Sequence, residues 1–403
     1  SYPENNKIRR EIIINEMYDQ GKITEDEYDA AMKESANMTF VGYTSDRDDE
    51  DDNDDGYVQN WYIDELFYDA QKDLAQYYNI SEDAASDKLY TEGLKIYCAM
   101  DVRAQEMIEN AAQNIDKSSD PELQIAMTLM GFDGRVIATV GSSDKKTGAL
   151  SWDRATESSL QPGSSIKPLV AYGPGLDTGA ITLASAIDDA PYYYSGTDAR
   201  LVKNYTEGQY LGYMTVREAL TRSQNVPAVK VLTQITPSVG FSYLEKFGLS
   251  TLVSTKNAIN GNHDVVQSLA LGGMTKGVCN IDMTAAYAAI ANKGTYTKPI
   301  YYTKVLDREG NVIIDNSIPE THRVLKESSA WLLTSGMESV VNSGTATRAK
   351  LSNQPVAGKT GTTQFDTDIW FCGFTPYYTA SIWVGYDDNS KRCLLYTSPS
   401  PRD

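Results

Sequence analysis

The sequence contains few of the residues on which many metal and redox sites depend. Its 403 residues include two histidines and four cysteines. The cysteines are widely separated and form no C-x-x-C pair: Cys98, Cys279, Cys372 and Cys393. Such spacing indicates neither a disulfide framework nor a zinc site. We therefore expect no metal and no cofactor.

Long apolar runs and several common ligand-binding motifs are also absent. No stretch approaches the ~18 apolar residues of a membrane-spanning helix, and no signal peptide is present. No G-x-S-x-G, G-x-G-x-x-G or P-loop pattern occurs, which argues against α/β-hydrolases, dinucleotide-binding folds and phosphate loops. The net charge of −19, without basic patches, argues against a nucleic-acid partner.

Negative charge is concentrated in residues 46–55, which hold eight acidic side chains and one arginine. Charges of one sign at this density repel one another and cannot pack. We interpret the run as part of a solvated linker. Calcium binding is the alternative, but the run lacks the glycine-punctuated ligand spacing of an EF-hand loop.

The rest of the chain, 41% hydrophobic overall, has the pattern of a globular protein. Apolar spacing and capping signals predict helices over 8–20, 24–32, 60–78, 101–115, 280–292 and 329–341, with 167–248 mostly helical. Alternation predicts strands over 94–99, 125–130, 135–140, 301–307, 312–315, 355–363, 369–374 and 379–386. Strands at both ends of a domain, with helices between them, predict an α+β fold whose sheet joins distant parts of the chain.

Three short motifs follow one another along this domain. Ser164 and Lys167 form S-x-x-K, Ser223 and Asn225 form S-x-N, and Lys359 begins K-T-G. Each motif alone is weak evidence. Their order, from helix start through loop to strand, is what favours a common site.

Copies of the same motifs occur elsewhere in the chain. Residues 142–146 contain two S-x-x-K matches, 146–148 read K-T-G, and 35–37 read S-x-N. These copies are in the wrong order and lie in a loop or just before the linker. We interpret them as coincidental.

The motif set predicts a serine acyl-transfer site whose base is a lysine. A serine hydroxyl needs a neighbouring base, and residues i and i+3 of a helix share a face, so Ser164 can meet Lys167. For Lys167 to accept a proton, its pKa must be lowered by burial or by a second cation, for which Lys359 is the obvious candidate. Ser223 would relay a proton between the two lysines and the leaving amine.

The remaining motif residues are predicted to hold the substrate. Asn225 offers its amide to a peptide group, and Gly361 would let a substrate backbone approach its strand closely. Backbone N–H groups of Ser164 and Thr362 would form an oxyanion hole. At the start of its helix, Ser164 would also lie where the dipole stabilises negative charge.

The motifs and their flanking residues resemble the transpeptidase domain of class A penicillin-binding proteins. The resemblance spans about residues 89–392 and rests on 152–156, 161–168, 217–220, 223–229, 270–273, 285–288, 344–346, 357–363 and 368–371. It implies the penicillin-binding-protein/β-lactamase-like α+β fold, an antiparallel sheet flanked by helices with a mostly helical subdomain. It also implies that Ser164 attacks the D-Ala-D-Ala bond of a peptidoglycan stem peptide and passes the acyl group to an amine of a neighbouring stem.

The same resemblance implies ligands and a location. Thr360 and Thr362 would contact the donor carboxylate, and β-lactam antibiotics would acylate Ser164 as mimics of the donor. Residues 1–40 resemble the C-terminal helices of the family's glycosyltransferase domain. We therefore expect that domain and a membrane anchor upstream of Ser1, on the outer face of the bacterial cytoplasmic membrane.

Four segments are expected on this basis. Residues 1–40 would end a glycosyltransferase domain, 41–88 would form a linker with the acidic run, and 89–392 would be a transpeptidase domain lacking the family's closing helix. Residues 393–403 form a Ser/Pro tail that resembles a translated sequencing adaptor, and we expect it to be non-native.

Three alternative functions share part of this signature. A class A β-lactamase needs a deacylating glutamate, but no E-x-x-L-N pattern lies between Asn225 and Lys359, and the span from Ser164 to Lys359 is long for that family. A D,D-carboxypeptidase would use the same groups with water as the acceptor. A non-enzymatic β-lactam sensor is the third alternative, against which the glycosyltransferase-like N-terminus argues.

Overall fold

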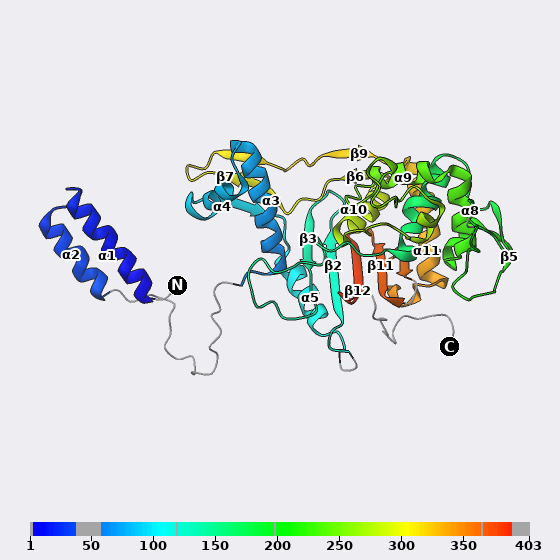
Figure 1. Ribbon diagram of the computed structural model, residues 1–403, viewed down its shortest axis with the longest axis horizontal. Helices are drawn as coiled ribbons and strands as arrows, with labels where there is room; N and C mark the ends of the chain where they lie inside the picture. The colour runs from blue at the N-terminus through cyan, green and yellow to red at the C-terminus, as the bar shows by residue number, and fades with distance from the viewer. Residues whose placement is uncertain (1–2, 38–57, 118–119, 197–198, 364–365, 389–403) are drawn as a thin grey trace. The chain divides into compact units, whose positions relative to one another are not determined.

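The structure is a computed structural model that describes residues 3–37, 58–117, 120–196, 199–363 and 366–388. The chain divides into two compact units, Ser1–Val58 and Gln59–Asp403, which are described separately (Figure 1). The acidic run at 46–55 and the tail at 393–403 lie outside the described residues. No described helix is both long enough and apolar enough to cross a bilayer.

The first unit is a pair of helices, α1 (Pro3–Asp19) and α2 (Glu25–Asn37), as the sequence predicts. Thr24 and Glu27 form a capping box at the start of α2. The Thr24 N–H donates to Glu27 Oε2 at 2.8 Å, and the Glu27 N–H donates to Thr24 Oγ1 at 3.4 Å. Each interaction satisfies an N–H group that the helix itself leaves free.

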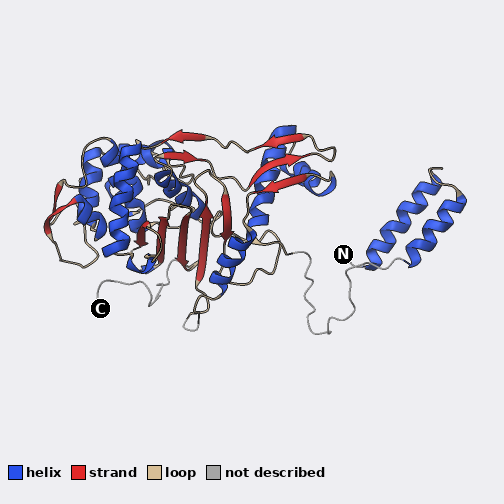
Figure 2. Cartoon of the chain, turned by 180° about the vertical axis from the view of Figure 1, so that it is seen from behind, coloured by secondary structure: helices blue, strands red, loops and turns tan. Residues whose placement is uncertain are grey.

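The second unit is built around a five-stranded antiparallel sheet (Figure 2). Its order is β10-β11-β12-β2-β3, so the last three strands of the chain pair with the early hairpin. The strands are β2 (Gln124–Met130), β3 (Val136–Val140), β10 (Ala357–Thr362), β11 (Asp368–Phe374) and β12 (Thr379–Gly385). The predicted α+β sheet is confirmed, and β10, which carries K-T-G, is an edge strand.

Both faces of this sheet are buried. Alternate residues of β2 and β12 point to opposite sides: Ile125 and Met127 pack in one apolar cluster, whereas Ala126 and Trp383 pack in a second, larger one. The smaller cluster includes residues of α5 (Val102–Gln113), and the larger one includes residues of α10 (Asn280–Ala291). Helices therefore cover the sheet on both sides.

Part of the segment expected to be a linker, 41–88, is packed structure. Residues 61–78 form α3 (Trp61–Tyr78), followed by α4 (Glu82–Thr91). Both pack beside a three-stranded sheet of β1 (Lys95–Cys98), β7 (Tyr302–Leu306) and β8 (Val312–Asp315). Tyr62 of α3 lies within hydrogen-bond distance of the backbone oxygens of Val136 (2.9 Å) and Tyr301 (2.6 Å).

The helical part of the second unit lies beyond the β10 edge of the sheet. It contains α6 (Gly173–Asp177), α7 (Val216–Thr221), α8 (Asn225–Ile235), α9 (Pro237–Lys246) and α11 (Glu327–Ser343). The prediction that 167–248 is mostly helical is wrong for 178–215. The described residues of that segment form loops and a pair of strands, β4 (Ala186–Asp189) and β5 (Gly212–Thr215), because its run of Gly, Pro, Asp and Tyr lacks a helical period.

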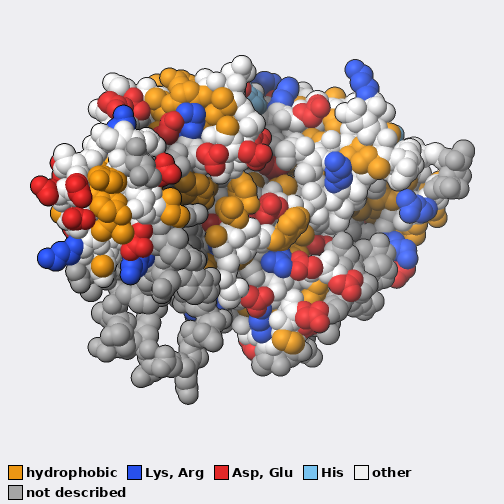
Figure 3. Space-filling model, turned by 60° about the vertical axis from the view of Figure 1, so that its left-hand side comes forward, with side chains coloured by type: hydrophobic (Ala, Val, Ile, Leu, Met, Phe, Trp, Pro, Cys, Tyr) orange, Lys and Arg blue, Asp and Glu red, His pale blue; other side chains and the backbone are white. Residues whose placement is uncertain are grey.

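A second two-stranded ribbon joins β6 (Thr295–Thr297) to β9 (Thr321–Arg323). On the face drawn in Figure 3, acidic, basic and apolar side chains are interspersed. Charges of both signs thus share this surface.

Candidate active site

The segment that carries Ser164 is helical but is not an α-helix at its start. Residues 163–166 form a 3₁₀ turn, and 168–172 form a π-type turn in which the Gly173 N–H bonds to Pro168 O. Pro168 has no N–H with which to bond to Ser164 O, so the α pattern cannot form there. In a 3₁₀ turn residues i and i+3 are eclipsed, which places Ser164 and Lys167 on one side.

Glycines let this turn approach two other backbones. Gly163 has φ +51°, and a Cβ there would lie 2.6 Å from Thr362 O. A Cβ on Gly272, which has φ +80°, would lie 2.5 Å from Gly163 N. Larger residues at these positions would push the turn away from β10.

Gly361 lies against the turn that carries Ser164. A Cβ on Gly361 would lie 2.4 Å from Pro162 O and 3.0 Å from the Ser165 side chain. The missing side chain therefore makes room for this turn, and the approach of a substrate backbone stays a prediction. Sequence reasoning missed this because the neighbour of Gly361 is almost two hundred residues away.

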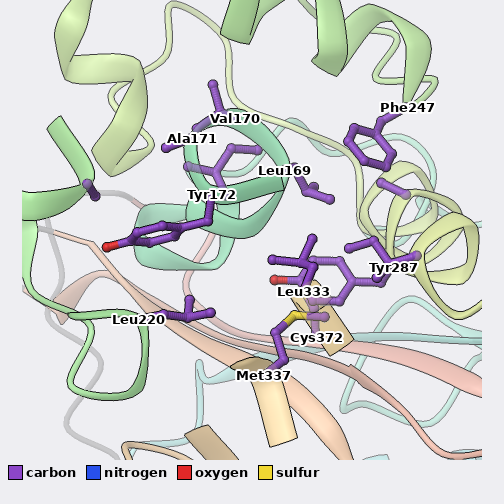
Figure 4. Packing of buried hydrophobic residues seen from close by; sticks show 14 of the residues in the cluster. Leu169, Val170, Ala171, Tyr172, Leu220, Phe247, Tyr287, Leu333, Met337 and Cys372 are labelled. Carbon is purple, nitrogen blue, oxygen red and sulfur yellow. The ribbon is translucent and has the colours of Figure 1, made fainter. Parts of the chain in front are cut away.

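The chain that follows Lys167 is anchored in the largest apolar cluster. Residues Leu169, Val170, Ala171 and Tyr172 are fully buried. Figure 4 shows them among side chains from α7, α10, α11 and β11: Leu220, Tyr287, Leu333, Met337 and Cys372. The Tyr287 hydroxyl also donates to Ser165 O at 2.6 Å. The turn that carries Ser164 is thus fixed by the buried residues that follow it and by the hydrogen bond from Tyr287.

Lys167 and Lys359 both approach the hydroxyl of Ser223. Both lysines are 0% exposed. Lys359 Nζ donates to Ser223 Oγ at 2.7 Å, and Lys167 Nζ lies 3.4 Å from the same oxygen. Lys167 Nζ also donates to Asn225 Oδ1 at 2.6 Å and to Ser223 O at 2.7 Å. Lys359 Nζ further donates to Thr360 O at 3.0 Å.

Burial lowers the pKa of both lysines. Burial, and next the charge of Lys359, hold the pKa of Lys167 well below its usual value. Burial lowers the pKa of Lys359 to about 7. The charge of Lys359 disfavours the protonated form of Lys167, because two ammonium groups this close repel one another. Lys167 therefore gives up its proton more readily than an isolated lysine does.

Ser223 has a strained backbone. Its φ is +57°, in the left-handed region that glycine normally occupies at the end of a helix. The N–H groups of Ser223 and Gln224 bond to Leu220 O and Ala219 O, which closes α7. A serine in this conformation costs about 1–2 kcal/mol, and its hydroxyl is the group that joins the two lysines.

Both the oxygen and the nitrogen of the Asn225 side-chain amide form hydrogen bonds. Its Oδ1 accepts from Lys167, and its Nδ2 donates to Lys203 O at 2.8 Å. Asn225 thus holds the Lys167 side chain. The predicted contact with a substrate peptide group would use the second N–H of its amide.

The open edge of β10 faces the site. Successive N–H groups of a strand point to opposite sides, and the Thr363 N–H bonds to Asp368 O across the ladder at 3.1 Å. The Thr362 N–H therefore points away from β11, toward the turn that carries Ser164. Thr360 Oγ1 on the same strand lies 2.7 Å from Thr345 Oγ1.

Most of these residues line one cavity of about 700 Å³. The predicted residues among its lining are Ser164, Ser223, Asn225, Thr360 and Thr362, and the buried lysines lie beneath them. The wall also contains a segment that sequence reasoning did not single out, which includes Asn204, Tyr205, Thr206, Gln209 and Leu211. No local motif marks that segment, which belongs to the part of the chain predicted as helix.

The additional motif copies have structural partners. Lys146 forms a buried ion pair with Asp64 at 2.6 Å. Ser142 Oγ donates to Gln124 Oε1 at 2.8 Å. Among the described residues, no three His, Cys, Asp or Glu side chains are grouped as a metal site would require.

Known proteins resemble this chain in sequence and in fold. Residues 126–391 match the model of the penicillin binding protein transpeptidase domain. The chain belongs to this family. It is 32% identical over 412 residues to penicillin-binding protein 1A of Clostridium botulinum, covering 98% of this chain and 48% of the relative. It is 34% identical over 351 residues to penicillin-binding protein 1A of Clostridium tetani, covering 82% of this chain and 43% of that relative.

Solved structures show the same fold. PonA1 of Mycobacterium tuberculosis in complex with penicillin V aligns with a TM-score of 0.70 and 25% identity, covering 83% of this chain and 87% of PonA1. Penicillin-binding protein 1A of Haemophilus influenzae aligns with a TM-score of 0.69 and 19% identity, over 96% of this chain and 73% of that one. The chain spans about half the length of the curated relatives it matches.

Proposed function

We propose that the protein is a serine-type D,D-transpeptidase that cross-links peptidoglycan stem peptides through an acyl-enzyme on Ser164. The observation that carries the proposal is the hydroxyl of Ser223 between two buried lysines, beside the pocket that Ser164 lines. A neutral lysine one 3₁₀ turn from a serine is the base that such a nucleophile needs.

The proposed acylation moves one proton and exchanges one bond. Lys167 accepts the proton of Ser164 Oγ, which attacks the carbonyl carbon between the two D-alanines. The oxyanion is stabilised by the backbone N–H groups of Ser164 and Thr362. As the C–N bond breaks, the proton passes from Lys167 through the Ser223 hydroxyl to the leaving amine. D-alanine departs, and the donor remains as an ester on Ser164.

Deacylation would run the same steps in reverse with a new amine. The amine of a neighbouring stem attacks the ester and gives up its proton through Ser223 to Lys167, and Ser164 is released. The positive charge of Lys359, together with Thr360 and Thr362 on the open edge of β10, would hold the terminal carboxylate of the donor. Asn225 would contact the donor's peptide group.

A β-lactam would acylate Ser164 as a mimic of the donor, and the amine released by ring opening would stay attached to the acyl group. PonA1, a relative by fold and sequence, is described in complex with penicillin V.

We also propose that the whole protein carries a peptidoglycan glycosyltransferase domain and a membrane anchor before Ser1. Residues 1–40 would end that domain, and the protein would work on the outer face of the bacterial cytoplasmic membrane.

The pocket lining argues against a β-lactamase. Among the described residues that line it, Glu218 is the one acidic side chain, and it pairs with Arg222 at 3.0 Å. A hydrolase of that class needs a carboxylate free to activate water at the ester.

Labelling by a fluorescent penicillin tests the nucleophile. Ser164→Ala should abolish covalent labelling. The matched control is Ser142→Ala, which removes the serine of another S-x-x-K copy and should leave labelling intact. Labelling that survives Ser164→Ala would overturn the proposal.

A donor stem-peptide mimic with candidate amines tests the reaction itself. Mass spectrometry should find the amide adduct together with released D-alanine. If water is the sole acceptor with every amine, the enzyme is a D,D-carboxypeptidase; if the pocket labels but never turns over any donor, it is a sensor.

A further inference from the structure

The N-terminus of α8 is capped by a residue from a distant loop. The residue before the helix, Gln224, makes no side-chain cap. Instead, Asn204 Oδ1 accepts the N–H groups of Asn225 at 3.0 Å and Val226 at 3.3 Å. The first N–H groups of a helix have no partner within it, so Asn204 fixes where α8 begins.

Asn204 is itself held by a buried carboxylate. Its Nδ2 donates to Asp189 Oδ1 at 2.8 Å and to Gln209 O at 3.1 Å. Asp189 Oδ2 accepts the Leu211 N–H at 3.0 Å. Asp189 is 0% exposed and Asn204 is 6% exposed. Every N–H of the Asn204 amide is paired in this low-dielectric setting, which allows a single orientation of the side chain.

The network continues to the base. Asn225 is held by the side chain of Asn204 at its backbone N–H and by Lys203 O at its Nδ2. Its Oδ1 accepts from Lys167 Nζ at 2.6 Å. Lys203 and Asn204 thus both hydrogen-bond to Asn225, and Asn225 hydrogen-bonds to Lys167.

We propose that Asn204, oriented by Asp189, is a positioning residue for the base Lys167. The inference rests on the proposed function and adds residues that none of the three motifs contains. Asn204 and its neighbours Tyr205 and Thr206 also line the pocket of Ser164. A substrate in the pocket therefore touches the same segment that aligns the base.

Stopped-flow acylation by a chromogenic β-lactam separates binding of the drug from the chemical step. Asn204→Ala should lower the acylation rate constant by about 10–100-fold, because a misplaced base loses about this much. The dissociation constant of the non-covalent complex should stay within about threefold, since Asn204 acts on the base.

An exchange of the two side chains tests the pairing. Asn204→Asp alone places two carboxylates together and should reduce acylation further. Adding Asp189→Asn restores an amide–carboxylate pair, and the carboxylate at 204 can still accept both helix N–H groups. The double variant should acylate at least about tenfold faster than Asn204→Asp alone.

A buried amide elsewhere in the unit provides the control for general destabilisation. Gln105 Nε2 donates to Thr139 O at 2.7 Å, and Gln105 Oε1 accepts from Thr139 N at 2.9 Å, beside the central sheet. Gln105→Ala should lower the melting temperature without changing the acylation rate constant. An equal loss in both alanine variants would overturn the inference.

The outcomes also separate this inference from the proposed function. If wild-type protein labels, Ser164→Ala does not, and Asn204→Ala acylates at the wild-type rate, the positioning role alone is wrong. If the Asn204→Ala defect lies only in binding, Asn204 shapes the pocket and does not align the base. If Ser164→Ala still labels, the proposed function fails first.

Discussion

Two pairs of like-charged side chains are buried in the larger unit, one cationic and one anionic. Lys167 and Lys359 are buried beside the pocket of Ser164, whereas Glu65 of α3 and Asp153 are buried elsewhere in the same unit. Burial, and next the charge of Asp153, raise the pKa of Glu65 to about 8. Burial raises the pKa of Asp153 to about 7. Both pairs thus contain groups that titrate near neutrality.

Their surroundings differ. The lysines share the hydroxyl of Ser223, which lines the pocket of Ser164. Asp153 Oδ2 has no hydrogen-bond partner among the described residues, and neither acid lines that pocket. A displaced pKa therefore reports burial beside a like charge. A reactive site needs, in addition, an accessible nucleophile and a path for its proton.

The sharpest test of this comparison removes one member of each pair. Lys167→Ala should slow acylation by about 10²–10⁴-fold, the usual contribution of a positioned base. Glu65→Ala should leave acylation at the wild-type rate. Stopped-flow acylation of both variants, with circular dichroism to check folding, makes the measurement. Comparable losses in the two variants would mean that the acid pair also serves the reaction.

The stability of the protein should respond to the acid pair in a pH-dependent way. The folded pKa of Glu65 lies above its unfolded value near 4.5. Between these values the folded state binds more protons, so the free energy of unfolding falls as the pH rises, and the whole penalty is present above about pH 8. Glu65→Gln removes this penalty. The difference in the free energy of unfolding between the variant and the wild type should therefore grow, in favour of the variant, by on the order of 3 kcal/mol from pH 5 to pH 9.

Denaturant unfolding at both pH values measures this difference. Asp153→Asn should act in the same direction, because its pKa is also raised. A Glu65→Gln variant whose stability tracks the wild type at both pH values would show that Glu65 ionises freely.

The smallest effect concerns the strained residue between the lysines. Ser223→Gly and Ser223→Ala both remove the hydroxyl, so both should slow acylation. Glycine tolerates the φ of +57° that alanine resists, so Ser223→Gly should be about 1 kcal/mol more stable than Ser223→Ala. Equal melting temperatures for the two variants would contradict the claim that strain is stored at this position.

Local signals predicted most of the regular structure. The predicted helices over 24–32 and 101–115 and the predicted strand over 312–315 correspond to α2, α5 and β8. Each of these elements depends on residues within one turn or one strand, so the local sequence is enough to predict it. The pocket wall at 203–211 was missed for the opposite reason, since its hydrogen bonds to α8 join residues about twenty positions apart.

The sequence by itself determined which residues could react, because the spacing of Ser164 and Lys167 and the order of the three motifs are properties of the chain. The tertiary structure decided which of them meet. Lys359 reaches Ser223 across 136 residues, Gly361 faces the turn of Ser164, and Asn204 caps a helix that begins 21 residues later. Only packing sets these contacts, because burial of both lysines and the alignment of three backbone segments depend on the whole core.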